Sequence, residues 1–589
     1  MCGIIGYIGK QNVAPILFNG LKRLEYRGYD SAGIATLASG FHVKKDVGKV
    51  DEIHQRLNFL DIPGTIGVAH TRWATHGGVT KENSHPHVDC EEKIAVVHNG
   101  IIENYQELKR NLISLGHKFR SQTDTEVIPH LIEEIMKKGK NFHDATISTV
   151  KSLEGSYAII VLDKNERKLI AARKGSPLVL GVSDSGYFAA SDIPAFLEHT
   201  KNVVYMQDYD LVQLTDNGFK VFNSLENREV ERKIDTIDWD IKQAEKGEFE
   251  HFMLKEISEQ VETVQKAVQQ DKKIIDDVVR NIRNAHGVFL IGSGTSYHAC
   301  LTASYILSKI SKMHVNVVLA SEFPNYEHFI TSKTLLFAVS QSGETADVLE
   351  AVKIAKLKSS KIISIVNVLG SSLTRTSDSF LSLNAGPEIC VLATKSYTSQ
   401  LALFTLLSYA LAGKYDEGKK KLNYLWNVIY QLTSATTRSK IKELAEILKE
   451  KNNIFLIGRG LQYATALEAA LKIKEVSYIH AEALAGGELK HGTIALIENG
   501  TPCIVFVSED NEKEVLSNAM EIKSRGGLII GVSPKNNDIF DFWIKVPEAH
   551  NENPIVQIIP IQILAYQLAL LRGLDPDRPR NLAKSVTVK

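Results

Sequence analysis

The second half of the chain repeats its own sequence, and this repeat constrains the fold more than any other feature. Three pairs of segments match in the same order and at nearly constant offset: 288–294 with 454–460, 336–340 with 505–508, and 400–403 with 567–570. The first glycines of the first pair, Gly292 and Gly458, are 166 positions apart. A repeat of this length is far longer than a solenoid unit. The sequence therefore predicts two tandem copies of one subdomain.

Apolar segments are arranged differently in the two parts of the chain. After residue 245, strand-like runs alternate with helical patterns, which favours parallel sheets. Before about residue 215, short apolar runs predict a layered α+β domain, with strands at 67–70, 94–98, 158–162 and 169–172 and helices at 15–26 and 125–136. The stretch 224–250 between these parts is charged and polar, so we predict a linker with a domain boundary near residue 240.

Composition excludes several classes of protein. The 589 residues carry a formal net charge of +0, so we expect no binding to nucleic acid or to an anionic membrane. The most apolar stretch, 555–571, contains three glutamines and a proline, which predicts a buried helix rather than a membrane span. The N-terminus has neither a basic segment nor a long apolar one, so we expect no signal peptide and a cytoplasmic location.

The cysteines argue for a reducing compartment. They are odd in number and without Cys-x-x-Cys spacing: Cys2, Cys90, Cys300, Cys390 and Cys503. This pattern argues against a disulfide scaffold and against a zinc site. His85 and His87 are two residues apart and invite a metal hypothesis, but such pairs are more often on the surface or structural. We therefore predict no metal.

Cys2 directly follows the initiator methionine in the segment Met-Cys-Gly-Ile-Ile-Gly. Removal of Met1 would leave a thiol and a free α-amine on the same residue. A free α-amine has a pKa of about 7.7–8.0, so a fraction of it is unprotonated near neutral pH and can take the proton of its own thiol. The sequence thus suggests an N-terminal nucleophile. The alternative is a cysteine at position two that has no catalytic role.

Polar residues cluster in three segments of the first domain, 70–77, 98–104 and 121–126. Arg72 could bind a carboxylate with two parallel hydrogen bonds (a bidentate contact), and Asp124 could pair with an ammonium group. Asn99 and the amide of Gly100 offer the donors of an oxyanion hole. These residues predict a site for an amino acid. The alternative for 121–126 is an ordinary helix cap formed by Thr123 or Asp124.

The repeated half carries loops that suit an anion. Ser340, Ser342 and Thr345 lie between an expected strand, 335–339, and an expected helix, 346–355, and Ser-Gly-Thr-Ser at 293–296 follows another strand in the same way. Hydroxyls and free amides at a helix start suit a phosphate. Open α/β sheets bind ligands at the carboxyl ends of their strands. The alternative is a pair of capped helices without a ligand.

Lys472 and Glu475 are three residues apart and share one face of an expected helix. One interpretation is a surface ion pair. The other is chemical, because a partly desolvated carboxylate can move a proton between adjacent carbons of a ketose phosphate. A lysine amine can also form an imine with an open-chain carbonyl.

Five segments, 2–6, 24–33, 70–77, 98–100 and 123–126, together resemble the class II glutamine amidotransferases, which are N-terminal-nucleophile hydrolases. The resemblance implies that Cys2 attacks the glutamine amide and forms a glutamyl thioester, with Asn99 and Gly100 stabilising the oxyanion. It implies further roles for six residues: glutamine binding by Arg72, Thr75, His76 and Asp124, support of the terminal amine by Arg27, and gating of ammonia by Trp73.

The repeated half resembles a tandem pair of SIS (sugar isomerase) domains, and the whole chain is similar to the glucosamine-6-phosphate synthase family. The resemblance implies Glu475 as the base between C1 and C2 of the sugar, assisted by Lys472, and His491 in ring opening. Lys584 in the C-terminal tail matches the lysine that forms an imine with the ketose. Contacts to sugar and phosphate are implied for Thr295, Ser296, Ser340, Gln341, Ser342 and Thr345.

The resemblance also implies the organisation and the reaction. The expected parts are an αββα N-terminal-nucleophile hydrolase domain (2–225), a linker (226–244), two α/β SIS domains with parallel sheets (245–430 and 431–575) and a catalytic tail (576–589). The expected reaction transfers the amide nitrogen of L-glutamine to D-fructose 6-phosphate and isomerises the product to D-glucosamine 6-phosphate, the first step of hexosamine synthesis. No oxidation occurs, so we expect no cofactor. A homodimer through the SIS domains is implied.

Two positions depart from the family, and two other functions stay open. Ser293 stands where the family often has cysteine, and Ala393 stands where it has serine, so we assign no role to Ala393. One alternative is a related SIS amidotransferase with another sugar-phosphate acceptor. The other is a regulator that binds sugar phosphate without turnover, which the presence of Glu475, His491 and Lys584 together disfavours.

Overall fold

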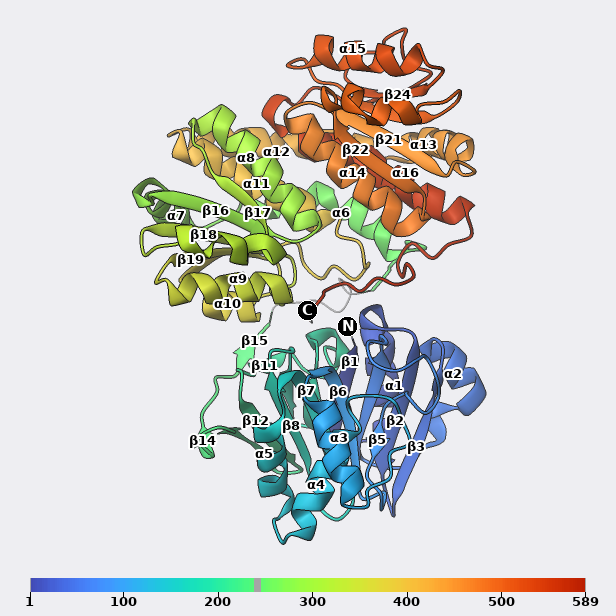
Figure 1. The fold of residues 1–589 in the computed structure, drawn as a ribbon, viewed down its shortest axis with the longest axis vertical. Coiled ribbons are helices and arrows are strands. Elements are labelled where there is room, and N and C mark those ends of the chain that lie inside the picture. Colours follow the sequence, from blue (N-terminus) through green and yellow to red (C-terminus); the bar gives the residue numbers. More distant parts are fainter. Residues whose placement is uncertain (1, 238–244, 588–589) are drawn as a thin grey trace. The chain divides into compact units, whose positions relative to one another are not determined.

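The computed structural model describes residues 2–237 and 245–587 (Figure 1). The chain divides into two compact units. The first comprises Met1–Ala244 together with Ala583–Lys589, and the second comprises Glu245–Leu582.

Within the residues described, the first unit contains two antiparallel sheets and five helices. The eight-stranded sheet has the order β15 (Asp235–Thr236), β11 (Asn202–Tyr205), β9 (Val179–Ser183), β10 (Gly186–Ala190), β1 (Gly3–Gly9), β4 (Ile66–Arg72), β2 (Ser31–Leu37), β3 (Phe41–Val47). The seven-stranded sheet has the order β14 (Arg228–Val230), β13 (Gly218–Asn223), β12 (Asp210–Thr215), β8 (Leu169–Lys174), β7 (Gly155–Asp163), β6 (Ile94–Ile102), β5 (His87–Val88). The helices are α1 (Val13–Leu24), α2 (Val50–Leu57), α3 (Tyr105–Ser114), α4 (Val127–Lys137) and α5 (Phe142–Ser152), with 3-10 turns η1 (Glu25–Arg27), η2 (Phe59–Asp61) and η3 (Ile193–Ala195).

Alternate side chains of the central strands enter different layers. In β7, Ala158 and Ile160 join the core between the two sheets, whereas Ile159 and Val161 pack with residues of α4 and α5 on the outer face. A separate core joins α1 to the outer face of the eight-stranded sheet. Strands buried on both faces have continuous apolar runs, which is why these strands could be predicted from the sequence. The layers are therefore α-β-β-α, and this part of the expected fold is confirmed.

The second unit contains two parallel five-stranded sheets. Their orders are β17 (Asn316–Leu319), β16 (Gly287–Gly292), β18 (Thr334–Ser340), β19 (Lys361–Val366), β20 (Ser379–Ser382), and β22 (His480–Ala485), β21 (Asn453–Gly458), β23 (Pro502–Phe506), β24 (Leu528–Ser533), β25 (Phe542–Lys545). The helices are α6 (Phe252–Ala267), α7 (Lys272–Asn284), α8 (Thr295–Ser311), α9 (Ala346–Leu357), α10 (Ser372–Thr376), α11 (Lys395–Leu411), α12 (Tyr415–Leu432), α13 (Ala435–Leu448), α14 (Leu461–Ser477), α15 (Glu512–Lys523) and α16 (Asn553–Leu571). The 3-10 segments are η5 (Ala320–Phe329), η6 (Glu488–His491), η7 (Thr493–Leu496) and η8 (His550–Glu552).

The two parallel sheets confirm the tandem repeat. In each sheet, the second strand of the copy lies at the edge beside the first strand, and the remaining strands follow in chain order. The helices after the first strands, α8 and α14, have 17 residues each. By length and composition, the stretch His550–Leu571 would pass as a membrane span, but 83% of its apolar window is buried inside the fold. The prediction of a buried helix there is correct.

The structure places several boundaries differently from the expectation. The expected linker, 226–244, contains the edge strands β14 and β15, and its residues 238–244 lie outside the described residues. Edge strands often carry charged side chains, which makes them resemble a linker in sequence. Helix α12 continues through the expected boundary at 430 and ends at Leu432. In the expected tail, the segment from Ala583 groups with the first unit.

The packing between the two antiparallel sheets gives a stability prediction. We expect Ile160→Ala to lower the free energy of unfolding of the first unit by about 2–5 kcal/mol, because it opens a cavity at a fully buried position. The matched control is Ile113→Ala on α3, where the side chain is 52% exposed and the expected loss is small. Urea unfolding measures both, and equal losses would contradict the assigned core.

Candidate glutamine and sugar-phosphate sites

Cys2 lies just before strand β1 and is held by residues after β4 and on β6. Strand β1 lies between β10 and β4, and its pairing with β4 places Gly3 opposite Thr71. The Trp73 backbone N–H donates to Cys2 Sγ at 3.3 Å, and Sγ lies 3.5 Å from the Trp73 carbonyl oxygen. From β6 in the other sheet, Asn99 Nδ2 donates to the Cys2 carbonyl oxygen at 2.9 Å. The structure thus brings together three of the residues expected in the glutamine site.

The surroundings of the thiol oppose its spontaneous ionisation. Burial raises the pKa of Cys2, while the N-terminal charge, the Trp73 N–H and Arg72 act in the opposite direction. Asp124 adds to the increase, so it lies close enough for its charge to act on the thiol. A partly buried thiol with a raised pKa needs a base beside it to become a nucleophile, and an α-amine on the same residue would supply one.

Gly100 occupies a position that only glycine fits. Its φ is +131°, and a Cβ there would lie 2.0 Å from the Ser156 carbonyl oxygen. The tight approach follows from the pairing of β6 with β7, which places Gly100 opposite Tyr157. The backbone at Asn99 and Gly100 is therefore fixed by the sheet, as donors of an oxyanion hole must be.

Arg72 shapes the loop that carries Trp73, Thr75 and His76. As the last residue of β4, Arg72 donates from Nη1 to the Gly78 carbonyl oxygen at 3.0 Å and from Nη2 to two further carbonyls of the loop. Within this loop Thr75 is exposed, and the His76 ring packs edge-on against Tyr105.

Asp124 and Thr123 do not cap a helix. The Asp124 carboxylate is buried and accepts the Ile102 backbone N–H of β6 at 2.8 Å, and Thr123 Oγ1 lies 3.0 Å from His87 Nε2. Helix α4 begins after Glu126, without a side-chain cap. The helix-cap interpretation is therefore wrong, because both side chains are turned toward neighbouring strands.

Four histidines form a buried group behind this loop. The rings of His70 and His85 stack at 4.0 Å, and those of His85 and His87 lie 4.6 Å apart. His98 lies beside them and donates its backbone N–H to His85 Nδ1 at 3.3 Å. Burial lowers the pKa of all four. The pair at 85 and 87 is therefore buried rather than on the surface.

Two aspartates that the sequence analysis did not assign support the expected site residues. Asp30 Oδ2 accepts the Ala74 backbone N–H at 2.8 Å and so holds the loop beside Cys2. Asp192 pairs with Arg27 at 2.7 Å and also accepts the Tyr26 hydroxyl. Asp30 stands inside the matched segment 24–33 and could have been found there, whereas nothing near Asp192 in the sequence points to Arg27.

The expected phosphate loops lie at the carboxyl ends of two neighbouring parallel strands. Ser340 ends β18, and its buried hydroxyl accepts the Gly343 backbone N–H at 3.0 Å and lies 3.0 Å from Thr345 Oγ1. Gln341 and Ser342 follow it and are partly exposed. At the end of β16, helix α8 begins with Thr295 and Ser296.

Lys472 is the centre of a buried charged group. Lys472 Nζ lies 2.7 Å from Glu475 Oε2, 3.4 Å from Glu468 Oε1 and 3.0 Å from Thr295 Oγ1, and its side chain is fully buried. His298 Nδ1 lies 2.8 Å from Glu468 Oε2. Burial would lower the pKa of Lys472, but the two carboxylates outweigh it and raise that pKa above its ordinary value. The surface-pair interpretation is therefore wrong, and Glu468 is a member that the sequence analysis missed.

The remaining expected residues lie elsewhere in the chain. His491 is exposed at the end of η6, shortly after β22. Lys584 is partly buried in the segment Ala583–Lys589, which groups with the first unit. Gln400 on α11, which was not predicted, donates from Nε2 to Ser296 Oγ at 3.0 Å and fixes that hydroxyl.

Comparisons with known proteins define the class. The SIS domain family matches residues 281–410 and 447–572, and the glutamine amidotransferase domain family matches residues 70–198. The chain is thus a glutamine amidotransferase domain joined to two SIS domains. Proteins named glutamine–fructose-6-phosphate aminotransferase (isomerizing) from Pyrococcus horikoshii, Thermococcus kodakarensis and Clostridium acetobutylicum are 47%, 45% and 42% identical, each over 100% of both chains. The chain belongs to the glutamine–fructose-6-phosphate aminotransferase (isomerizing) family.

Solved structures agree with this assignment for the second unit. The C-terminal domain of glucosamine-fructose-6-phosphate aminotransferase from Francisella tularensis is 33% identical, with a TM-score of 0.52, and the match covers 56% of this chain and 99% of that one. A putative phosphosugar isomerase from Silicibacter pomeroyi is 26% identical, with a TM-score of 0.50, over 56% of this chain and 100% of that one.

The buried histidines give a pH prediction. Their folded-state pKa values lie below the unfolded value of about 6.5, so only the unfolded chain gains protons as the pH falls. Stability of the first unit should be full above pH 6.5 and should fall by up to about 1.4 kcal/mol per pH unit for each such histidine below it. Urea unfolding at pH 7.5 and 5.5, with hydrogen-exchange mass spectrometry to assign the transition, measures this loss.

A matched pair of variants tests the cause. His85→Gln should reduce the pH dependence by about one proton, whereas His42→Gln, on the partly exposed strand β3, should leave it unchanged. An unchanged slope in His85→Gln would show that the acid sensitivity arises elsewhere.

Proposed function

We propose that the chain transfers the amide nitrogen of L-glutamine to D-fructose 6-phosphate and isomerises the product to D-glucosamine 6-phosphate, leaving L-glutamate. The observation that carries the proposal is the pairing of two sites in one chain. One places a thiol at the start of a central strand beside Asn99. The other buries Lys472 of α14 between two carboxylates and against Thr295, which follows β16. Full-length similarity to relatives named glutamine–fructose-6-phosphate aminotransferase (isomerizing) supports the proposal.

In the first half-reaction, Cys2 is the proposed nucleophile. Its α-amine, once Met1 is removed, takes the thiol proton, and Sγ attacks the glutamine amide carbon. Asn99 Nδ2 and the Gly100 amide stabilise the oxyanion, and the C–N bond breaks to release ammonia. Water then hydrolyses the thioester to glutamate. Proposed contacts to glutamine are Arg72, Thr75, His76 and Asp124, with Arg27 supporting the terminal amine and Trp73 acting as the ammonia gate.

In the second half-reaction, Lys584 and Glu475 have distinct proposed roles. Glu468 and Glu475 lie 3.4 Å and 2.7 Å from Lys472 Nζ and raise the pKa of Lys472, which favours a cation that orients Glu475 over an amine that forms an imine. We assign the imine with the ketose to Lys584, and ring opening to His491. Imine formation releases water, and ammonia then displaces the Lys584 amine to give the free imine at C2. Glu475, oriented by Lys472, moves a proton from C1 to C2 of this imine. Thr295, Ser296, Ser340, Gln341, Ser342 and Thr345 are the proposed contacts to the sugar and its phosphate.

Assembly and location are further parts of the proposal. A homodimer through the SIS domains is expected from the resemblance, and light scattering that gives the mass of one chain at assay concentrations would contradict it. A cytoplasmic location is expected from the scattered cysteines without Cys-x-x-Cys spacing, which suit a reducing compartment.

Two substitutions separate the half-reactions. Cys2→Ala should reduce glutamine hydrolysis by about 10³-fold or more because the nucleophile is lost. Lys584→Ala should spare glutamine hydrolysis and stop formation of the amino sugar. Glutamate release and mass detection of glucosamine 6-phosphate, with glutamine and fructose 6-phosphate as substrates, report the two activities. Retention of glutamine-dependent synthesis by Cys2→Ala would refute the assignment of the first site.

A further substitution tests the base. Glu475→Gln should lower kcat for amino-sugar formation by about 10²–10⁴-fold while glutamine hydrolysis persists, because the proton-transfer group is neutralised. Glu446→Gln on α13 is the matched control, since Glu446 makes an exposed ion pair with Lys449 at the same spacing and at 3.0 Å. Wild-type kcat in Glu475→Gln would rule out this carboxylate as the base.

A further inference from the structure

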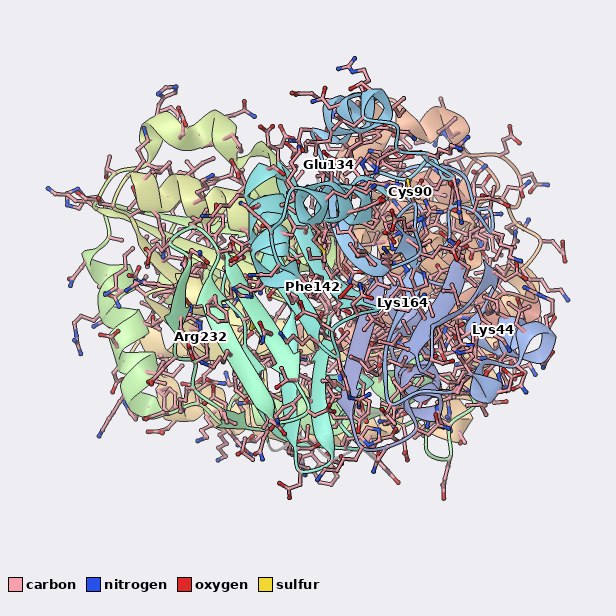
Figure 2. The ribbon with its side chains drawn as sticks, turned by 90° about the horizontal axis from the view of Figure 1, so that it is seen from below. Lys44, Cys90, Glu134, Phe142, Lys164 and Arg232 are labelled. Atoms are coloured by element: carbon pink, nitrogen blue, oxygen red, sulfur yellow. The ribbon has the colours of Figure 1, made fainter. Side chains whose placement is uncertain are left out.

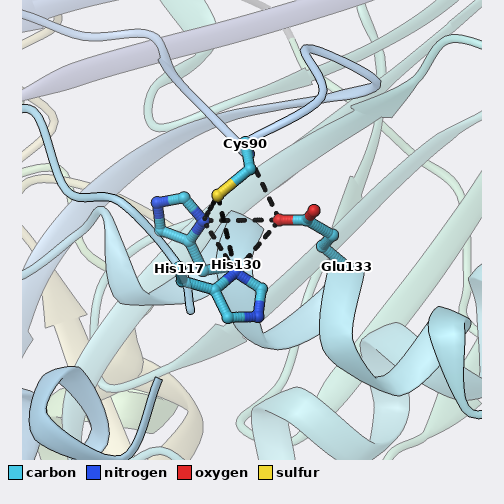
Figure 3. Close-up of side chains that lie close together, drawn as sticks. All are labelled: Cys90, His117, His130 and Glu133. Atoms are coloured by element: carbon cyan, nitrogen blue, oxygen red, sulfur yellow. Dashed lines mark hydrogen bonds and ion pairs between the residues drawn. The ribbon is translucent and has the colours of Figure 1, made fainter. Parts of the chain in front are cut away.

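Four potential metal ligands converge in the first unit, and none of them has a role in either half-reaction: Cys90, His117, His130 and Glu133 (Figure 3). Cys90 follows β5, His117 follows α3, and His130 and Glu133 are on α4. The two histidines and the glutamate are at most 5% exposed, and Cys90 is partly buried. Figure 2 shows Cys90 and the neighbouring Glu134 on the same face of this unit.

The ligand atoms have the separations of a tetrahedral zinc site. With Zn–N of about 2.0–2.1 Å and Zn–S of about 2.3 Å, tetrahedral geometry separates N from N by about 3.3 Å and S from N by about 3.6 Å. The two Nδ1 atoms of His117 and His130 are 3.3 Å apart, and Cys90 Sγ lies 3.7 Å and 3.6 Å from them. Glu133 Oε2 lies 3.2 Å and 3.4 Å from the same nitrogens.

Outer contacts orient these ligands toward a common centre. His117 Nε2 lies 3.3 Å from Glu134 Oε2, so a proton on Nε2 leaves the Nδ1 lone pair free to bind a cation. The other oxygen of Glu133 accepts from Lys137 Nζ at 2.7 Å. The Lys118 backbone N–H donates to Cys90 Sγ at 3.4 Å, which suits a thiolate. Metal-bound histidines and carboxylates usually have such second partners.

Charge and hydrogen bonding both favour a cation at the centre. When His117 donates its Nε2–H outward, its Nδ1 carries no proton and can only accept. This Nδ1 then faces a carboxylate oxygen, a sulfur and a second ring nitrogen, and hydrogen bonds alone cannot satisfy all of these close contacts at once. A divalent cation satisfies them together. A thiolate, a carboxylate and two neutral imidazoles balance its charge, so the filled site is neutral and its burial is not costly.

We propose that Cys90, His117, His130 and Glu133 bind one structural Zn²⁺. Four protein ligands complete the tetrahedron, which is the pattern of a structural site rather than a catalytic one. Mixed sulfur and nitrogen ligands select zinc over magnesium or calcium. The ion would link the loop after β5 to His117 and His130, which lie at the two ends of the segment 117–130. That segment carries Asp124. The site therefore acts by fixing the conformation of a loop proposed to bind glutamine.

Metal content tests the proposal directly. Full-length protein with any affinity tag removed, purified without chelators and dialysed against metal-free buffer, should contain about one zinc per chain by mass spectrometry of the metal. Cys90→Ser and His130→Gln should lose this zinc. Cys300→Ser is the matched control, because Cys300 is buried in α8 of the other unit, and it should keep it.

A second measurement uses wild-type protein only, in case the variants fold poorly. A strong chelator should lower the Tm of the first unit by about 5–10 °C, and equimolar Zn²⁺ but not Mg²⁺ should restore it. Co²⁺ added in place of zinc should give the absorption bands of a tetrahedral thiolate site. Absence of bound zinc together with a Tm unaffected by chelator and by Zn²⁺ would overturn the proposal and leave the cluster as a hydrogen-bonded one.

Discussion

The first unit depends on the chain beginning inside a sheet rather than at its edge. Strand β1 has a partner on each side, so the residue before it cannot move freely. This pairing presents Cys2 to the end of β4, where Trp73 contacts the sulfur, and to Asn99 from the second sheet. A terminal residue is normally poorly ordered unless its strand is held in this way. In the proposed mechanism, this fixed position would let Cys2 provide both the nucleophile and, once Met1 is removed, the base.

In the second unit, the site is organised around a buried lysine, Lys472. The first copy of the repeat contributes Thr295 and His298, and the second copy contributes Glu468, Lys472 and Glu475. The charged group therefore exists only because two copies of the subdomain pack together. A single buried charge would be costly, but the paired carboxylates hold the proton on Lys472. The repeat thus serves to build a polar site inside an apolar core.

The sequence predicted the layers, the repeat and the polar loops that follow strand ends, because apolar periodicity and fixed motifs act over short distances. It failed where partners are distant in sequence. Asp192 binds Arg27 from 165 residues away, and Glu468 meets Thr295 across the two copies. Charge patterning hid β14 and β15, since edge strands and linkers are both polar. The ligands of the proposed zinc site lie in three separate segments, after β5, after α3 and on α4, so their spacing matches no short motif.

The state of the N-terminus tests the central claim most directly. Active protein can be quenched with acid during glutamine turnover, and its N-terminal peptide can be analysed by mass spectrometry. The account predicts a peptide that begins at Cys2 and carries a glutamyl group on Sγ in part of the molecules. Full glutamine-dependent activity in protein that retains Met1 would contradict it, because the sulfur would then lack an amine on its own residue.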